Sequence, residues 1–332
     1  MRKIVCFCLV VVSFMMFDRV SFGATFEEAL NALSASLPSG ADIASMGGVQ
    51  TMEGFTSSNP AVTSIMKEGK FSSTLNYGDF VFEKTNLQMY SASFGAKTGE
   101  LVVQLGAGYA KTPLRSVTPL QSLKIENTAL EVQIGGRVAK KVFFKEDEFY
   151  LGAGYGFSQN KISGLSIVPT PATTFVTELE TNADCHSAKI GLAYKPFPNL
   201  LLGASGSRAW SFSQTAYNGF KDEAVGMHTD TSRVGFSLKV TDLTMLAADY
   251  QHLDFSNSDT KFDQLFAGIE QYVIKDALAL YAGYANGGVT GGAGIYFKQG
   301  GINLSYGHNL FRETKEFLGN ADAYMVSVYL NF

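Results

Sequence analysis

LVVQLGAGYA, residues 101–110, is the stretch that decides the fold of this chain. Its odd-numbered positions carry mostly apolar or aromatic side chains, whereas its even-numbered positions are mostly small or polar. Because successive side chains of a β-strand point to opposite faces, this alternation predicts a strand with one apolar and one polar face. The pattern returns at 149–157, 234–240 and 302–307. We therefore predict an all-β protein beyond Lys70.

The connections between the predicted strands separate a membrane barrel from a soluble β-sandwich, which shows the same alternation. We count fourteen candidate strands, centred near residues 75, 92, 105, 132, 153, 189, 205, 234, 248, 267, 280, 294, 305 and 328. Alternate connections are tight, as at 97–100 and 298–300, and the others are longer, as at 111–124, 160–181 and 310–321. An even strand count with turns sorted in this way is typical of bacterial outer-membrane proteins. The sequence predicts a transmembrane antiparallel β-barrel of about 14 strands.

The last predicted strand carries an apolar face that runs to the terminal residue. This face is formed by Tyr324, Val326, Val328, Leu330 and Phe332. It resembles the C-terminal signal by which outer-membrane barrels are recognised for insertion, so we expect the barrel-assembly machinery as a partner. A barrel leaves no strand edge in lipid, so the last strand should pair with the first, near 71–78, and the long loops should face outward.

The N-terminus has the pattern of a secretory signal peptide, residues 1–23. A basic start and an apolar core, 4–17, are followed by small residues up to Gly23. The apolar run is shorter than the ~20 residues that a membrane-spanning helix needs. We expect cleavage after Gly23 and localisation in the bacterial outer membrane. Cleavage leaves Cys185 as the remaining cysteine, so we expect no disulfide within one chain.

Composition and motifs argue against several other functions. The net charge of −4 disfavours a nucleic-acid partner. The glycine-rich runs 152–156 and 291–294 do not open a helix after a strand, as a phosphate-binding loop does. On a strand, Asp184 and His186 share one face and Cys185 takes the other, so we expect no metal site. No spacing of serine and histidine indicates a catalytic set, so we expect no enzyme activity and no cofactor. We expect residues 70–332 to form a single barrel domain that is surrounded by outer-membrane lipid.

Residues 24–69 precede the first strand and carry too little charge for a solvated tail. Pro60 fixes its own φ and favours extended geometry at Asn59, while Gly47 and Gly48 permit backbone conformations that other residues resist. We predict that 24–69 forms a compact hatch, or plug, inside the barrel mouth. A disordered periplasmic extension is the alternative.

The same region carries three short motifs in a fixed order: Gly40-Ala41, Met46-Gly47-Gly48 and Asn59-Pro60-Ala61. In this the chain resembles the FadL-type outer-membrane transporters of long-chain fatty acids and other hydrophobic compounds, with their PorV-type relatives. The resemblance is local over 39–61 and architectural beyond it. It implies a fourteen-stranded barrel whose hatch contains these residues. The chain is shorter than the fatty-acid transporters, and Val62 stands where a glycine commonly follows the third motif.

The resemblance implies passive uptake of a hydrophobic, fatty-acid-like small molecule by capture at the outer loops, passage to the hatch, and sideways exit through the wall. One alternative is a structural or secretion-assembly role without transport, as in PorV-type relatives. The lumen carries residues of both signs, such as Glu131 and Arg137, so a general porin for small polar solutes is a further alternative. A plugged lumen disfavours the porin.

Two segments are candidates for steps in such uptake. The loop expected at 163–176 is apolar for an exposed segment, and exposed apolar surface often marks a capture site. Its candidate capture residues are Leu165, Ile167, Val168 and Phe175. In FadL-type barrels the third strand is kinked to form a lateral gap, and the third strand predicted here places Gly106 and Gly108 on its inner face. The alternatives are a loop packed on its neighbours and glycines that make room for the hatch.

Overall fold

The computed structural model describes residues 37–38, 41–51, 58–65, 71–112, 115–118, 121–169, 174–217, 220–221, 225–256 and 260–332. The predicted signal peptide and Gly40 lie outside the described residues. The helices of the described part are short: α3 (Ala41–Ser45), α4 (Pro60–Thr63), η1 (Arg312–Thr314) and α5 (Lys315–Leu318). None of them is long and apolar enough to cross a bilayer.

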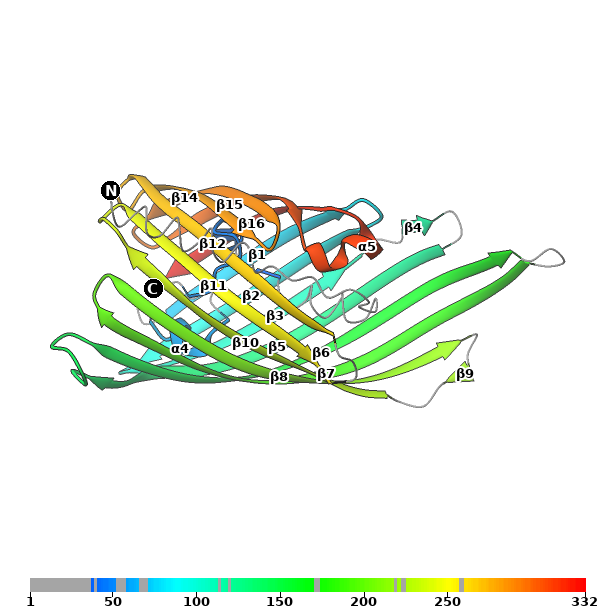
Figure 1. The fold of residues 1–332 in the computed structure, drawn as a ribbon, viewed down its shortest axis with the longest axis horizontal. Coiled ribbons are helices and arrows are strands. Elements are labelled where there is room, and N and C mark those ends of the chain that lie inside the picture. Colours follow the sequence, from blue (N-terminus) through cyan, green and yellow to red (C-terminus); the bar gives the residue numbers. More distant parts are fainter. Residues whose placement is uncertain are drawn as a thin grey trace.

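Of the sixteen strands in the described part of the chain, fourteen close into a barrel, in which each strand pairs antiparallel with the next (Figure 1). The wall consists of β1 (Phe71–Phe82), β2 (Asn86–Thr98), β3 (Leu101–Lys111), β5 (Gln121–Lys140), β6 (Glu148–Pro169), β7 (Thr174–Phe197), β8 (Leu200–Tyr217), β10 (Val225–Lys239), β11 (Thr244–Phe255), β12 (Lys261–Ile274), β13 (Leu278–Ala285), β14 (Gly288–Phe297), β15 (Gly300–Leu310) and β16 (Ala321–Asn331). The short strands β4 (Arg115–Thr118) and β9 (Phe220–Lys221) pair with β5 and β8. Each predicted strand centre falls within a barrel strand, so the predicted fold is confirmed.

The first and last strands close the wall. β1 and β16 pair in one unbroken register from Ser72↔Asn331 to Phe82↔Ala321. At the end of this ladder, the backbone N–H of Phe71 donates to the carbonyl of Phe332 at 3.2 Å, and that of Phe332 donates to the carbonyl of Phe71 at 2.9 Å. Closure pairs the backbone of both terminal strands, as a segment inside lipid requires.

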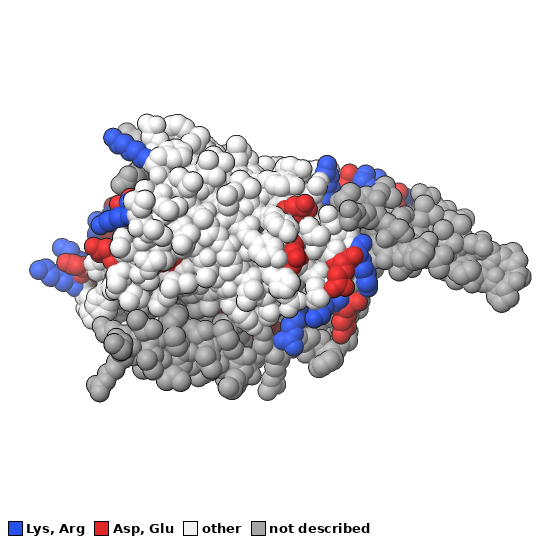
Figure 2. Space-filling model, turned by 90° about the horizontal axis from the view of Figure 1, so that it is seen from above, with Lys and Arg blue, Asp and Glu red and all other residues white. Residues whose placement is uncertain are grey.

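The outer face of the wall is an apolar belt. Strand after strand exposes large apolar side chains, among them Leu75 (62%), Leu130 (62%) and Ile190 (70%). Figure 2 shows one side of this belt, with charged residues gathered toward its two ends. Such a surface is unfavourable in water and suited to the hydrocarbon of a bilayer. Tyr324, Val326 and Leu330 of β16 are exposed, as is Phe332 directly after the strand, and Val328 is half-buried. Their role in insertion stays a prediction.

The wall is much taller on one side than on the other. β7 has 24 residues and β13 has 8. At about 3.3 Å per residue these strands are roughly 80 Å and 26 Å long, so the side of the wall formed by β5–β8 extends far beyond the side formed by β13 and β14, as Figure 1 shows. We name the two ends of the barrel by their connections: the short-turn end holds the chain end at Phe332, and the long-loop end is opposite.

This tall hairpin corrects the loop predicted between 160 and 181. Residues 163–169 continue β6 and 174–176 begin β7, with pairs such as Ile167↔Val176 in register. The prediction was wrong because the ladder of hydrogen bonds between β6 and β7 continues in register to Pro169↔Thr174, and an antiparallel ladder does not require a change of sequence to go on. Leu165, Ile167 and Val168 therefore lie in β6, and Phe175 lies in β7. Their side chains lie outside the described ones, and the capture role stays a prediction.

Candidate functional site

The described residues of the N-terminal segment, 41–51 and 58–65, lie against the inner face of the barrel. Helix α3 contacts β13–β16, whereas α4 contacts β5–β8. These two groups of strands lie opposite each other in the strand order, so the segment reaches from one wall to the other.

The backbone of α3 is attached to β14 and β16. The backbone N–H of Ala41 donates to Ser327 Oγ at 2.6 Å. At the other end of the helix, Thr290 Oγ1 donates to the carbonyl of Ser45 at 2.8 Å. Both contacts satisfy backbone groups at the helix ends, where the helix itself offers no partner.

A buried ion pair holds the chain after α3. Asp249 of β11 and Arg233 of β10 lie on the inner face, with Arg233 Nε 3.4 Å from Asp249 Oδ2. The same carboxylate oxygen accepts from the backbone N–H of Gln50 at 2.6 Å and of Thr51 at 3.2 Å. Arg233 Nη2 donates to the carbonyl of Gly48 at 3.2 Å. Both partners of the pair therefore bind the backbone of the N-terminal segment.

The Met-Gly-Gly motif brings the backbone of this segment into direct contact with the wall. Gly47 and Gly48 have φ values of 75° and 87°, which L side chains rarely adopt. A Cβ at Gly47 would overlap the backbone carbonyl of Tyr284, and one at wall residue Gly268 would lie 2.5 Å from the carbonyl oxygen of Met46. No side chain fits on either surface.

The Asn-Pro-Ala motif makes the equivalent contact on the opposite wall. Asn59 caps α4: its side-chain Oδ1 accepts from the backbone N–H of Ala61 at 3.0 Å, and Pro60 occupies the first turn. Asn59 Nδ2 donates to the carbonyl of Ala204 on β8 at 3.1 Å. A Cβ at Gly152 would overlap Pro60, so the wall glycine here accommodates α4.

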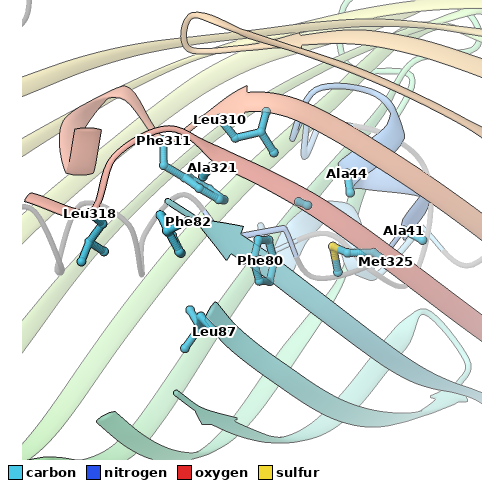
Figure 3. Close-up of a cluster of buried hydrophobic side chains, with 11 residues drawn as sticks. Ala41, Ala44, Phe80, Phe82, Leu87, Leu310, Phe311, Leu318, Ala321 and Met325 are labelled. Atoms are coloured by element: carbon cyan, nitrogen blue, oxygen red, sulfur yellow. The ribbon is translucent and has the colours of Figure 1, made fainter. Parts of the chain in front are cut away.

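An apolar cluster lies inside the barrel between α3 and the β15–β16 connection (Figure 3). We call it the inner apolar cluster; its buried members are Ala41, Ala44, Phe80, Phe82, Leu87, Leu310, Phe311, Leu318, Ala321, Ala323 and Met325. The ring centroids of Phe80 and Phe311 are 5.6 Å apart. Met89 of β2 and Ala110 of β3 pack against the cluster, so apolar surface continues along the inner face from β16 to β3.

A pocket adjoins this cluster. Its lining comes from the N-terminal segment, from strands β12–β16 and from the β15–β16 connection, and comprises Pro38, Ala44, Gly47, Gly48, Gln264, Phe266, Ala285, Asn286, Thr290, Ser305, Gly307, Leu310, Phe311, Glu313 and Ala323. Of these residues, Gly47 and Gly48 belong to the motifs that the sequence shows, and the others carry no comparable signal. They come from stretches far apart in the chain, and in the sequence each apolar member looks like any other strand residue.

Polar side chains line other parts of the lumen. Lys189 Nζ lies 2.6 Å from Glu131 Oε1, and Gln133 Nε2 donates to the same oxygen at 3.0 Å. Gln133 Oε1 in turn accepts from Thr63 Oγ1 at 3.3 Å. The lumen therefore carries polar networks as well as apolar clusters; a second apolar cluster, with Val62 and Tyr150 among its members, packs around α4 on the opposite wall.

Gly106 and Gly108 lie on the inner face of β3, on the same face as Ala110. A Cβ at either position would meet atoms of β2 and β5 no closer than 3.8 Å. Among the described residues, no atom of the N-terminal segment lies within 4 Å of these positions, in contrast to Gly152 and Gly268. β3 pairs with β2 and β5 along its whole length without a register shift.

The fold and the lumen define a class of protein: an outer-membrane β-barrel with an N-terminal segment folded into its interior. No protein-family model and no curated protein sequence matches the chain. Solved structures do match it. A Pseudomonas aeruginosa FadL homologue aligns with a TM-score of 0.62 and 10% identity over 89% of this chain and 99% of that one.

Two toluene transporters share the same fold. Pseudomonas putida TodX aligns with a TM-score of 0.59 and 15% identity, covering 88% of this chain and 98% of its own. Ralstonia pickettii TbuX aligns with a TM-score of 0.58 and 15% identity, covering 88% of this chain and 96% of its own. The chain therefore has the fold of the FadL-type outer-membrane transporters.

Proposed function

We propose that the protein is an outer-membrane channel for passive uptake of hydrophobic molecules and is not an enzyme. The observation that carries the proposal is the inner apolar cluster with its adjoining pocket. Barrel interiors are usually polar, so an apolar cluster beside a pocket departs from the usual lumen of an outer-membrane barrel. The fold shared with two toluene transporters supports the same reading.

In this proposal the N-terminal segment is a hatch. A hydrophobic molecule leaves water at the β15–β16 connection, where Leu310, Phe311 and Leu318 are buried. It then occupies the pocket, one side of which is formed by Ala44, Gly47 and Gly48. Residues 41–51 and 58–65 contact opposite walls of the barrel, and in this proposal these contacts keep the lumen closed to ions.

Uptake is tested in intact Gram-negative cells that lack another transporter for hydrophobic compounds. The lipopolysaccharide leaflet resists such compounds, so the initial uptake rate of the neutral dye N-phenyl-1-naphthylamine reports passage through the protein. We expect cells that make the protein to take up the dye at least about ten-fold faster than cells with an empty vector, a difference of about 1.4 kcal/mol in barrier.

A polar solute is the control in these cells. The rate of nitrocefin hydrolysis by a periplasmic β-lactamase should be unchanged. Nitrocefin carries a carboxylate, and transfer of this charge into an apolar cluster is unfavourable. Faster nitrocefin hydrolysis would indicate the porin alternative instead. A correctly inserted protein that changes neither rate would favour a structural or assembly role.

For the exit step we propose a lateral route through β3. A hydrophobic molecule gains nothing by entering periplasmic water, and the inner apolar cluster reaches Ala110, next to Gly108 and Gly106 on one face. Space at these two glycines is not taken up by the described part of the hatch. Glycine weakens a strand, so we expect the pairing of β3 with its neighbours to open at these two positions.

Replacing Gly106 and Gly108 together by valine fills this space and stiffens the strand. We expect dye uptake to fall about ten-fold while the barrel still folds, as judged by its heat-modifiable migration in gels. The matched control is Ala107→Val, which places the same side chain on the outer face of β3. Uptake by the double variant at the parental rate would refute the β3 route.

A further inference from the structure

The connection between β5 and β6, residues 141–147, exposes three apolar side chains at the short-turn end of the barrel. We call it the β5–β6 turn. Val142, Phe143 and Phe144 are 49%, 72% and 49% exposed. In Figure 1 this blue-green connection projects beyond the other turns at the same end. Exposed apolar side chains gathered in this way mark a surface that contacts a membrane or another molecule.

The buried carboxylate of Asp147 fixes the conformation of the turn. It accepts from the backbone N–H of Val142 at 2.7 Å, of Phe143 at 2.8 Å and of Phe144 at 3.1 Å. The hydroxyl of Tyr194 on β7 donates to the same carboxylate at 3.2 Å. Three backbone donors of the turn are therefore paired within the protein. The turn can enter apolar surroundings without leaving these N–H groups unsatisfied.

The aromatic rings of the turn lie on the outer side of the wall. The Phe143 ring centroid is 6.1 Å from that of Phe149 on β6 and 6.4 Å from that of Tyr194 on β7. By the alternation along each strand, both partners lie on the face that carries the apolar belt. The Phe144 ring centroid is 5.3 Å from that of Phe197, which is also exposed. The apolar belt therefore continues onto the turn.

Lysine residues flank the apolar side chains of the turn. Lys141 precedes them and Lys145 follows them, and both are exposed. Among the described residues, no ion pair involves either lysine. Within 141–147, Glu146 is the one exposed acidic residue, because the Asp147 carboxylate is buried against the backbone of the turn. Aromatic rings next to lysines are typical of a membrane interface, where the rings lie at headgroup level and the ammonium groups reach the phosphates.

We propose that the β5–β6 turn is a binding site for an anionic phospholipid of the periplasmic leaflet of the outer membrane. The short turns of outer-membrane barrels face the periplasm, and phospholipids form that leaflet. Phe143 and Phe144 insert beside the acyl chains, and Lys141 and Lys145 bind the phosphate of the headgroup. A periplasmic protein could also cover the turn, but the continuity of the turn with the lipid-facing belt favours lipid.

Phospholipids with brominated acyl chains quench a nearby indole, so they report which lipid lies beside the turn. The probe is Phe143→Trp in the full-length protein, whose single tryptophan is removed by Trp210→Phe. The protein is reconstituted in mixed vesicles of phosphatidylcholine and phosphatidylglycerol, and an equal amount of either lipid carries the bromine. We expect phosphatidylglycerol to associate with the turn at least about three-fold more strongly than phosphatidylcholine does.

Lysine variants of the probe protein separate charge from the position of the rings. Lys141→Gln combined with Lys145→Gln should lower the lipid preference to about one, whereas arginine at both positions should keep it. The matched control is Lys275→Gln combined with Lys298→Gln, which removes two exposed lysines from the β12–β13 and β14–β15 turns. Its preference should equal that of the probe protein. Heat-modifiable migration in gels checks that each variant is folded.

Two results would overturn the proposal. An indole that aqueous iodide quenches and that neither brominated lipid quenches would place the turn in water, and would favour a protein partner. Equal association of both lipids with the folded probe protein, or an unchanged preference after loss of Lys141 and Lys145, would refute an anionic-lipid site. Neither readout depends on transport, so these results leave the proposed uptake standing.

Discussion

The Asp249→Ala variant is expected to conduct ions in planar bilayers at least about ten-fold better than the parent protein. Asp249 is 1% exposed and accepts from the backbone N–H groups of Gln50 and Thr51. Its removal leaves both donors without this acceptor and leaves Arg233 as a buried charge without its counter-ion. Breaking a buried pair by removing one partner is unfavourable by about 3–5 kcal/mol. Residues 48–51 should therefore leave the wall, and water and ions should enter the lumen.

The barrel itself should survive this change, because its strands are held by backbone pairing that does not involve the carboxylate. Heat-modifiable migration checks this directly. The matched control is Asp254→Ala, which removes an acidic side chain of the same strand that faces outward and pairs with Lys261. Its conductance should equal that of the parent.

A double variant distinguishes the charge from the shape of the site. Arg233→Met combined with Asp249→Leu removes both charges, so no uncompensated ion remains buried. We expect it to conduct less than Asp249→Ala. If Asp249→Ala is folded and conducts no better than the parent, the segment around Gly48 does not close the lumen, and the hatch proposal is wrong.

Dye uptake by the Ala323→Phe variant is expected to fall at least about ten-fold. Ala323 is 3% exposed, lies on the inner face of β16, and lines the pocket next to Phe311 and Leu310. A phenyl ring at this position occupies the space that the proposal assigns to the ligand. Forcing extra volume into a packed interior is unfavourable by about 1–3 kcal/mol, which a fourteen-stranded ladder can tolerate.

The control for this variant lies on the same strand. Val326→Phe adds an aromatic ring to the apolar belt on the outer face, where the side chain of Val326 is 38% exposed. Uptake by this control should match the parent. Equal uptake by Ala323→Phe and the parent would show that hydrophobic molecules pass elsewhere, and the pocket would lose its role in the proposed function.

Much of the fold follows from the sequence, because the signals that define it are local. A period of two along each strand fixes which residues face lipid and which face the lumen, and turn residues fix where the chain reverses. An apolar face running to Phe332 indicated the closing strand, and β16 does pair with β1. Strand ends at the long-loop side were less predictable, because the pairing of β6 with β7 continues through residues 163–169 and 174–176, where the sequence has the proline and threonine content of a loop.

The motifs that resemble FadL-type transporters also pointed to the correct part of the chain. Gly47, Gly48, Asn59, Pro60 and Ala61 all contact or adjoin the inner wall in the described structure. Glycine and proline each have backbone preferences that are properties of the single residue, so the unusual backbone at these positions can be predicted from the sequence. The wall residues that these motifs contact could not be predicted from the sequence in the same way.

By itself the sequence determined that this protein is a barrel of about 14 strands, with an apolar outer face and an N-terminal segment of unusual backbone. Only the tertiary structure decided where that segment is attached and which lumen residues form a pocket. The contacts concerned join residues far apart in the chain: Ala41 to Ser327 and Gln50 to Asp249. The same holds for the hydrogen bond that Gln264 Nε2 donates to Glu313 Oε1 across 49 positions of the sequence. Such contacts depend on closure of the whole barrel, because closure brings distant strands to face one another. No local pattern of side chains predicts which residues then meet.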